Sequence, residues 1–211
     1  MPVVLAGGML GGCATLPTAT QIVADARAAL DAAPLCCAGL AQAQRLPLPL
    51  APAQVAIDKR SPAFDFGGHK AFFVLYELPA YSQPYSIVLT SQAAGSAQDV
   101  AIFIPRIALY DAGFEVSRHF DEKTLRNRGN NLERTVFVNA GNAGERYLAI
   151  YGSDLSSSIE RAYSMVTVTP VVAGPVMFNM YGGMDGKSVL RSSPVGTLAL
   201  EVQGLAPAPA R

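Results

Sequence analysis

The three cysteines of this 211-residue chain are the side chains whose positions define a specific chemistry. Cys13 follows an apolar segment at residues 3–10 and the triplet Leu10-Gly11-Gly12, which has the form of a lipobox. The small residues of such a motif give a processing peptidase access to the backbone, and the cysteine thiol takes up a diacylglycerol before cleavage. We therefore expect residues 1–12 to be a lipoprotein signal peptide and Cys13 to be the lipidated first residue of the mature chain.

The surroundings of Cys13 refine this interpretation. The leader begins Met1-Pro2 without the Lys or Arg that opens a signal peptide, a departure that an earlier translation start would explain. The alternative is an N-terminal strand or buried helix in which Cys13 is an ordinary core cysteine. Ala14 rather than Asp follows the cysteine, which favours attachment to the outer membrane with the chain facing the periplasm. No segment reaches the ~20 apolar residues of a membrane-spanning helix, so lipid is the expected attachment.

Cys36 and Cys37 remain as an adjacent pair, in a compartment where disulfides form. Adjacent cysteines close only a strained eight-membered ring, so a vicinal disulfide between them would be unusually easy to reduce. Two buried free thiols and a bridge to another chain are the alternatives.

Other reactive side chains form no catalytic pattern. His69 lies in a Gly-rich turn and His119 beside Arg118, and neither has the i, i+4 partner of a helical zinc site. No G-x-S-x-G segment occurs, and spacing selects no pair of carboxylates for glycoside hydrolysis. We expect a protein that is not an enzyme and that needs no metal or other cofactor.

Saccharide binding is a separate hypothesis, since flat aromatic faces pack against the C–H face of sugar rings. The chain has no Trp but eight Tyr. Tyr81 and Tyr85 flank an expected hairpin turn, and Tyr181 lies in a long irregular segment, so these three are the best candidates for stacking on a malto-oligosaccharide. The alternative is that the tyrosines line strand edges.

Composition bounds the class of protein. With 16 basic and 16 acidic residues the net charge is zero, which makes nucleic acid an unfavourable partner. Half of the residues are hydrophobic and the mean hydropathy is +0.26, enough for one folded domain with a sizeable core.

The first part of the mature chain, residues 13–52, is predicted to be a lipidated tether. Apolar residues at helical spacing predict a short amphipathic helix over residues 18–33, with Thr18 or Thr20 as its N-cap. Pro34 ends this helix. Residues 46–52 (LPLPLAP) alternate Leu with Pro and form an extended spacer, which we expect to lie along the face of the domain.

Residues 53–205 show the short apolar runs and Gly, Pro, Asn and Ser boundaries of a β protein. Strands are predicted at residues 54–57, 70–78, 85–91, 100–104, 107–110, 133–139, 147–151 and 196–202. Their spacing predicts a mainly β fold, an antiparallel β-sandwich. Pro105 indicates an edge, a bulge or a crossing between sheets. Residues 152–194 are interpreted as a long loop in which Asp154 caps a helical turn, and residues 206–211 as a disordered tail.

Several packing and turn segments follow one another along residues 36–202. They are Cys36-Cys37, Leu46-Pro47, SPAFDF (61–66), AFFVLYELP (71–79), Ile104-Pro105, Leu109-Tyr110-Asp111, Tyr151 with Asp154-Leu155, and SPVGTL (193–198). In these segments the chain resembles the maltose operon periplasmic protein (MalM) family. The resemblance implies an envelope protein linked to maltodextrin uptake, with no assigned enzymatic chemistry. The lipobox is a departure, because the namesake is regarded as a soluble periplasmic protein.

Two functions are therefore expected. The first is a non-catalytic lipoprotein of the outer membrane, facing the periplasm, that assists carbohydrate transport by binding saccharide or by contacting a transport protein. The second is a structural adaptor whose segment 152–194 grips another envelope protein, with Met177, Met180 and Met184 providing adaptable contacts. An unrecognised hydrolase is a third hypothesis.

Overall fold

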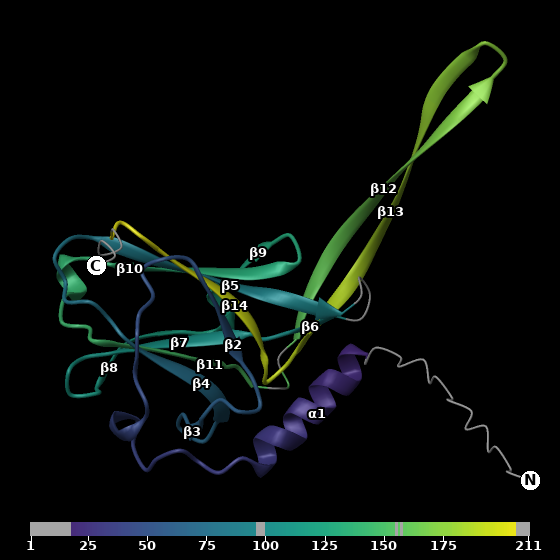
Figure 1. The fold of residues 1–211 in the computed structure, drawn as a ribbon. Coiled ribbons are helices and arrows are strands. Elements are labelled where there is room, and N and C mark those ends of the chain that lie inside the picture. Colours follow the sequence, from purple (N-terminus) through teal and green to yellow (C-terminus); the bar gives the residue numbers. More distant parts are fainter. Residues whose placement is uncertain (1–17, 96–99, 155, 157, 206–211) are drawn as a thin grey trace, which may run out of the picture.

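A computed structural model of the chain describes residues 18–95, 100–154, 156 and 158–205 (Figure 1). Two β-sheets pack face to face, so the predicted mainly β fold is confirmed, and the arrangement is that of a β-sandwich. The predicted signal peptide at 1–12, the lipidation site Cys13 and the predicted tail at 206–211 lie outside the described residues.

Each sheet has one long path of neighbouring strands. The first sheet contains β1 (Leu46–Pro47), β4 (Lys70–Glu77), β11 (Tyr147–Gly152), β7 (Pro105–Tyr110) and β8 (Val116–Phe120) in that order, with β3 (Ala63–Asp65) paired to β4. The second contains β12 (Ser158–Ala173), β13 (Val176–Ser192), β6 (Val100–Ile102), β5 (Tyr85–Gly95), β10 (Asn131–Val138) and β9 (Arg126–Arg128), while β14 (Gly196–Gln203) lies between β5 and β2 (Ala53–Ile57). The pairings are antiparallel except for β1 with β4 and β13 with β6.

The predicted N-terminal helix is α1 (Ala19–Ala32), and Thr18 is its N-cap. The Thr18 Oγ1 accepts from the Gln21 backbone N–H at 3.2 Å, and the Gln21 side chain accepts from the Thr18 N–H at 2.9 Å. This capping box satisfies two amide groups that a helix start leaves unpaired. Leu30 joins the main core, so α1 packs on the sandwich. Among the described residues, no helix has both the length and the apolar character needed to cross a membrane.

The Pro-rich segment runs beside the first sheet. Leu46 and Pro47 pair in parallel with the end of β4, and the Leu48 N–H donates to the Glu77 carbonyl at 3.1 Å. The Leu48 side chain is buried in the core. The described part of the chain also contains three short 3₁₀ turns, at Leu40–Gln42, Glu122–Thr124 and Ala140–Asn142.

The eight predicted strands all occur. β4 is buried along most of its length, as its nearly continuous apolar run predicts for a central strand. Pro105 marks a crossing between sheets, because β6 lies in the second sheet and β7 begins at Pro105 in the first. The fully buried side chain of Phe103 lies at this crossing. The main core is made of Ile and Leu side chains from both sheets, among them Ile57, Ile87, Leu89, Ile107, Leu109, Ile150, Leu198 and Leu200.

The prediction of a loop over residues 152–194 was wrong. This segment forms β12 and β13, a long antiparallel hairpin that projects from the sandwich (Figure 1). Its tip turns at Gly174, whose φ of 61° is readily adopted by glycine. The β-branched run from Val166 to Thr169 favours strand, but apolar residues on both faces hide the alternation that identifies half-buried strands. The predicted helical turn after Asp154 is also wrong, because strand follows from Ser158.

Candidate functional site

The three tyrosines predicted to stack on saccharide differ in exposure. Tyr85 is only 5% exposed and belongs to the main core, so its prediction as an exposed stacking residue was wrong. Tyr81 is partly buried and packs against the same core. Tyr181 is 71% exposed, on β13. Its aromatic face is therefore open to solvent.

The fold does not bring these tyrosines to one platform. Tyr85 begins β5, whereas the other end of β5 pairs through Gly95 with β6. β6 in turn pairs with the base of β13, and Tyr181 lies on the part of β13 that projects away from that base (Figure 1). A sugar chain stacked on Tyr181 would therefore find its other contacts on the hairpin itself.

Burial of Tyr85 has a consequence for stability at alkaline pH. Removal of the ring from water, with a smaller contribution from the nearby Glu145 carboxylate, raises the pKa of Tyr85 to about 12. In the unfolded chain the Tyr85 hydroxyl ionises near pH 10, whereas in the folded protein it stays protonated until about pH 12. The full unfolding free energy is therefore present below pH 10, and part of it is lost as the pH rises from 10 toward 12. The loss expected from Tyr85 is about 2–3 kcal/mol of unfolding free energy. Urea unfolding at several pH values measures it.

The Tyr85→Phe variant distinguishes the ionisation of Tyr85 from the ionisation of other groups at alkaline pH. It has no hydroxyl to ionise, so its unfolding free energy should fall less steeply than that of the unmodified protein above pH 10. Tyr181→Phe, at a ring that is exposed in the folded protein, is the matched control. Parallel curves for the unmodified protein and Tyr85→Phe would contradict the assignment.

Cys36 and Cys37 lie next to each other with their sulfur atoms in contact, paired as a disulfide. The Cys36 N–H donates to the Ala63 carbonyl at 2.8 Å, and Cys37 packs against an aromatic cluster on the outer face of the first sheet. The pair therefore lies on the sandwich surface beside β3. Its redox state in the cell stays a prediction.

Both histidines make hydrogen bonds within the fold. The His119 Nε2 lies 2.9 Å from the hydroxyl of Tyr151, whose ring stacks on Phe66 at a centroid distance of 3.8 Å. The His69 Nε2 lies 2.8 Å from the Gly152 carbonyl oxygen, which joins the turn before β4 to the end of β11. Within the described ranges, no three His, Cys, Asp or Glu side chains gather as ligands for a metal ion.

The β12–β13 hairpin exposes large apolar side chains on both of its faces. Residues that pair across the two strands share a face, so the register divides them into two sets. One face carries Val166, Val168, Val172, Met177 and Tyr181, and the other carries Val176, Phe178, Met180 and Met184. Exposed apolar surface of this extent is characteristic of a site that another molecule covers.

The distal part of the hairpin has no charged residue between positions 162 and 184. Charges return at its base, where Lys187 and Glu160 approach within 3.8 Å as an exposed pair. Strands exposed to water are usually protected by charges, especially Lys. The hairpin therefore has an apolar distal half without charges and a polar base that carries them.

The hairpin also has unpaired backbone edges. β12 is the last strand of its sheet, and β13 pairs with β6 only at Leu190, Arg191 and Ser192. Along the rest of β13 the edge that faces away from β12 has no neighbouring strand among the described residues. Free N–H and C=O groups on such edges are a template for strand addition.

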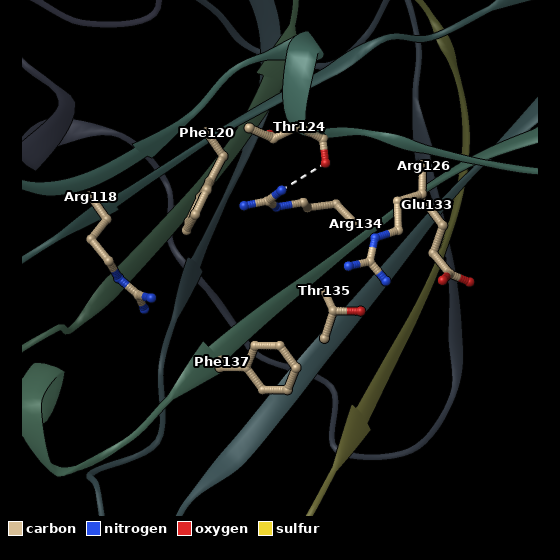
Figure 2. Close-up of a pocket in the computed structure, with 8 residues that line it drawn as sticks. All are labelled: Arg118, Phe120, Thr124, Arg126, Glu133, Arg134, Thr135 and Phe137. Carbon is tan, nitrogen blue, oxygen red and sulfur yellow. Dashed lines mark hydrogen bonds between the residues drawn. The ribbon is translucent and has the colours of Figure 1, made fainter.

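A second feature is a cavity of about 270 Å³ between β8, β9 and β10. Its lining comprises Arg118, Phe120, Thr124, Arg126, Glu133, Arg134, Thr135 and Phe137, which surround the open space in Figure 2. No pattern in the sequence predicted this cavity. Its arginines come from three strands, and the proximity of these strands has no signal in the sequence.

Arg134 lies between Phe120 and the other β10 side chains in the lining of this cavity (Figure 2). Its guanidinium carbon lies 4.3 Å from the centre of the Phe120 ring, and its Nη1 donates to the Thr124 carbonyl at 2.7 Å. The buried Nε of Arg134 has no hydrogen-bond partner among the described residues. Burial lowers the pKa of Arg134, and the positive charges of Arg126 and Arg118 lower it further, against an opposing contribution from Asp121.

Comparisons with protein-family models, with curated proteins and with solved structures found no match to this chain. The resemblance to the maltose operon periplasmic protein family stays a prediction based on the segments quoted for it.

Proposed function

We propose that this protein is a non-catalytic adaptor of the cell envelope that binds another protein through the distal half of its β12–β13 hairpin, residues 162–184. The observation that supports this most directly is the combination of exposed apolar side chains on both faces with the absence of charge over the whole segment. In water, exposed apolar area of this kind favours association, because burial in an interface removes it from solvent.

A protein suits the hairpin better as a partner than a saccharide does. Sugars are held by directed polar groups around an aromatic face, whereas most of the large apolar side chains exposed here are Val and Met. Flexible Met side chains adapt to an apolar partner surface, and Met177, Met180 and Met184 are all exposed on the hairpin. The free edges of β12 and β13 can also form main-chain hydrogen bonds with a partner. Only another polypeptide backbone offers matching N–H and C=O groups along the length of a strand.

The expected lipid anchor fits this function. A chain attached through Cys13 to the outer membrane would hold the sandwich near the membrane and present the hairpin to other envelope proteins. Assistance of carbohydrate transport, which the family resemblance implies, is compatible with an adaptor that contacts a transport protein. Direct binding of malto-oligosaccharide is the second candidate function, and the exposed face of Tyr181 favours it.

Site-specific photo-crosslinking in intact cells tests the adaptor function. A photoreactive residue at Val168 or Tyr181, which pair across the hairpin, should give a discrete adduct with another envelope protein. The same residue at Glu201, exposed on β14 of the sandwich, is the matched control and should give none. Adding Phe178→Ser and Met180→Ser, on the opposite face, should reduce the adduct about tenfold or more, because both faces are expected to contact the partner.

Three outcomes would contradict this proposal. Equal adducts from the hairpin and from Glu201 would show non-specific proximity, and an adduct containing only copies of this chain would indicate self-association. Saturable binding of maltodextrins that strengthens with chain length and falls in Tyr181→Ala, without any protein adduct, would instead support the saccharide function.

A further inference from the structure

The arginine-lined cavity lies at an open side of the sandwich, separate from the hairpin. β8 is the last strand of the first sheet, and β9 is the last strand of the second, next to β10. The turn at Glu122–Thr124 connects these two edges and closes one end of the space between them. Arg118 and Phe120 reach the cavity from β8, and Arg134 reaches it from β10 (Figure 2).

The charges that line the cavity do not balance. Three guanidinium groups face one carboxylate, that of Glu133. Glu133 is already paired with Arg128 at 3.3 Å, and the Arg118 guanidinium binds both carboxylate oxygens of Glu145 at 2.7 Å. Arg126 and Arg134 form no ion pair within 4.0 Å among the described residues, although Asp121 is close enough to Arg134 to oppose the lowering of its pKa.

Arg134 is held in place while part of its hydrogen-bonding capacity stays unused. The Phe120 ring and the Thr124 carbonyl fix the position of its guanidinium group. Apart from Nη1, its nitrogen atoms have no acceptor in the described part of the chain. A donor that is fixed before binding loses little conformational entropy when an acceptor arrives.

The cavity also has an apolar wall. Phe137 is 63% exposed, unusually open for an aromatic side chain within a strand, and it lines the same space as the arginines. Phe120 provides a second aromatic surface, already in contact with Arg134. A ligand that fits both parts would combine a negatively charged group with a compact carbon framework. The volume of about 270 Å³ lies just below the ~300–1,000 Å³ of ordinary small-molecule sites, which restricts the ligand to a small molecule.

We propose that this cavity is a binding site for a small organic oxyanion, a carboxylate or a phosphate ester on a sugar-sized framework. Arg126 and the free Nη2 of Arg134 would donate to the oxyanion, since guanidinium groups match the geometry of carboxylate and phosphate oxygens. The carbon framework would pack on Phe137. This site does not depend on the adaptor function, because the hairpin contributes no residue to it.

Titration of the full chain with four probes tests the proposal. D-glucuronate carries the carboxylate and glucose 6-phosphate the phosphate ester, while glucose lacks the anion and inorganic phosphate lacks the carbon framework. By calorimetry at low ionic strength, one or both of the charged sugars should bind saturably and glucose should not. Binding should weaken as salt is added. The charged sugar that binds more tightly identifies which oxyanion the site prefers.

Substitution assigns the binding to the cavity. Arg126→Gln, at an exposed position of β9, should weaken the charged sugar about tenfold. Arg60→Gln removes a positive charge from another exposed side chain, one that pairs with Asp58 and does not line the cavity, and should leave the affinity unchanged. Phe137→Ser should weaken a charged sugar more than inorganic phosphate.

Each contrary result overturns a defined part of the inference. Absence of binding by both charged sugars at tens of millimolar would exclude the site, and equal losses in Arg126→Gln and Arg60→Gln would assign the effect to general charge. Inorganic phosphate binding as tightly as the charged sugars would overturn the role of the carbon framework. None of these results depends on whether the hairpin binds a protein.

Discussion

Replacement of Phe103 by alanine is expected to lower the free energy of unfolding by about 3–5 kcal/mol. The Phe103 side chain is fully buried where the chain crosses from β6 to β7. Two glycines pack against it: a Cβ atom at Gly196 would lie 2.5 Å from the Phe103 Cβ, and one at Gly152 would lie 3.3 Å from the ring. With no neighbouring side chain at either glycine to fill the space, the cavity left by Phe103→Ala cannot readily collapse.

Chemical denaturation measures this loss directly. Phe137→Ala removes the same number of atoms from an exposed strand position and is the matched control, with an expected loss below about 1 kcal/mol. If the two variants lost equal stability, Phe103 would not be the centre of packing at the crossing. A further variant, Phe103→Leu, should recover part of the loss, because it refills some of the volume.

The second large effect is expected at Glu145, which is only 4% exposed. Its carboxylate accepts from Nε and Nη2 of Arg118, both at 2.7 Å, and from the Ser117 hydroxyl at 2.9 Å. Glu145→Leu would remove every one of these acceptors and leave a partly buried guanidinium unpaired. Because Arg118 retains some access to water, the expected loss of unfolding free energy is about 2–3 kcal/mol.

A double-mutant cycle distinguishes loss of the ion pair from loss of packing. The double variant Arg118→Met, Glu145→Leu leaves no charge of this ion pair unpaired. It should therefore be more stable than the single variant Glu145→Leu. Additive losses would show that the two side chains do not stabilise each other. Since Arg118 also lines the oxyanion cavity, this cycle measures stability without added ligand.

Local sequence signals predicted the regular elements well, for reasons that the structure makes clear. The helix at residues 18–33 was predicted from apolar spacing and a Thr cap, and Thr18 with Gln21 forms a capping box one turn long. The eight predicted strands and the crossing at Pro105 also depend on neighbours close in sequence. Such features are local because backbone conformation responds to side-chain type within a few residues.

Burial was predicted less well. Tyr85 follows a Pro-containing turn, which indicated exposure, yet its ring lies in the core because it begins a central strand. Conversely, the apolar residues of β12 and β13 are exposed, although their composition is that of a core. An apolar strand has the same sequence whether a second sheet covers it or not, so its surroundings decide its burial.

By itself the sequence determined a folded, mainly β protein, the N-terminal helix, most strands and the expectation of a lipid anchor. Only the tertiary structure decided that residues 158–192 form a hairpin extending away from the core and that Arg118, Arg126 and Arg134 surround one cavity. The physical reason is distance along the chain. Turns, caps and strands arise from contacts between residues close in sequence. The exposure of the hairpin and the arginine-lined cavity depend instead on which strands, far apart in sequence, pack against each other and which stay uncovered.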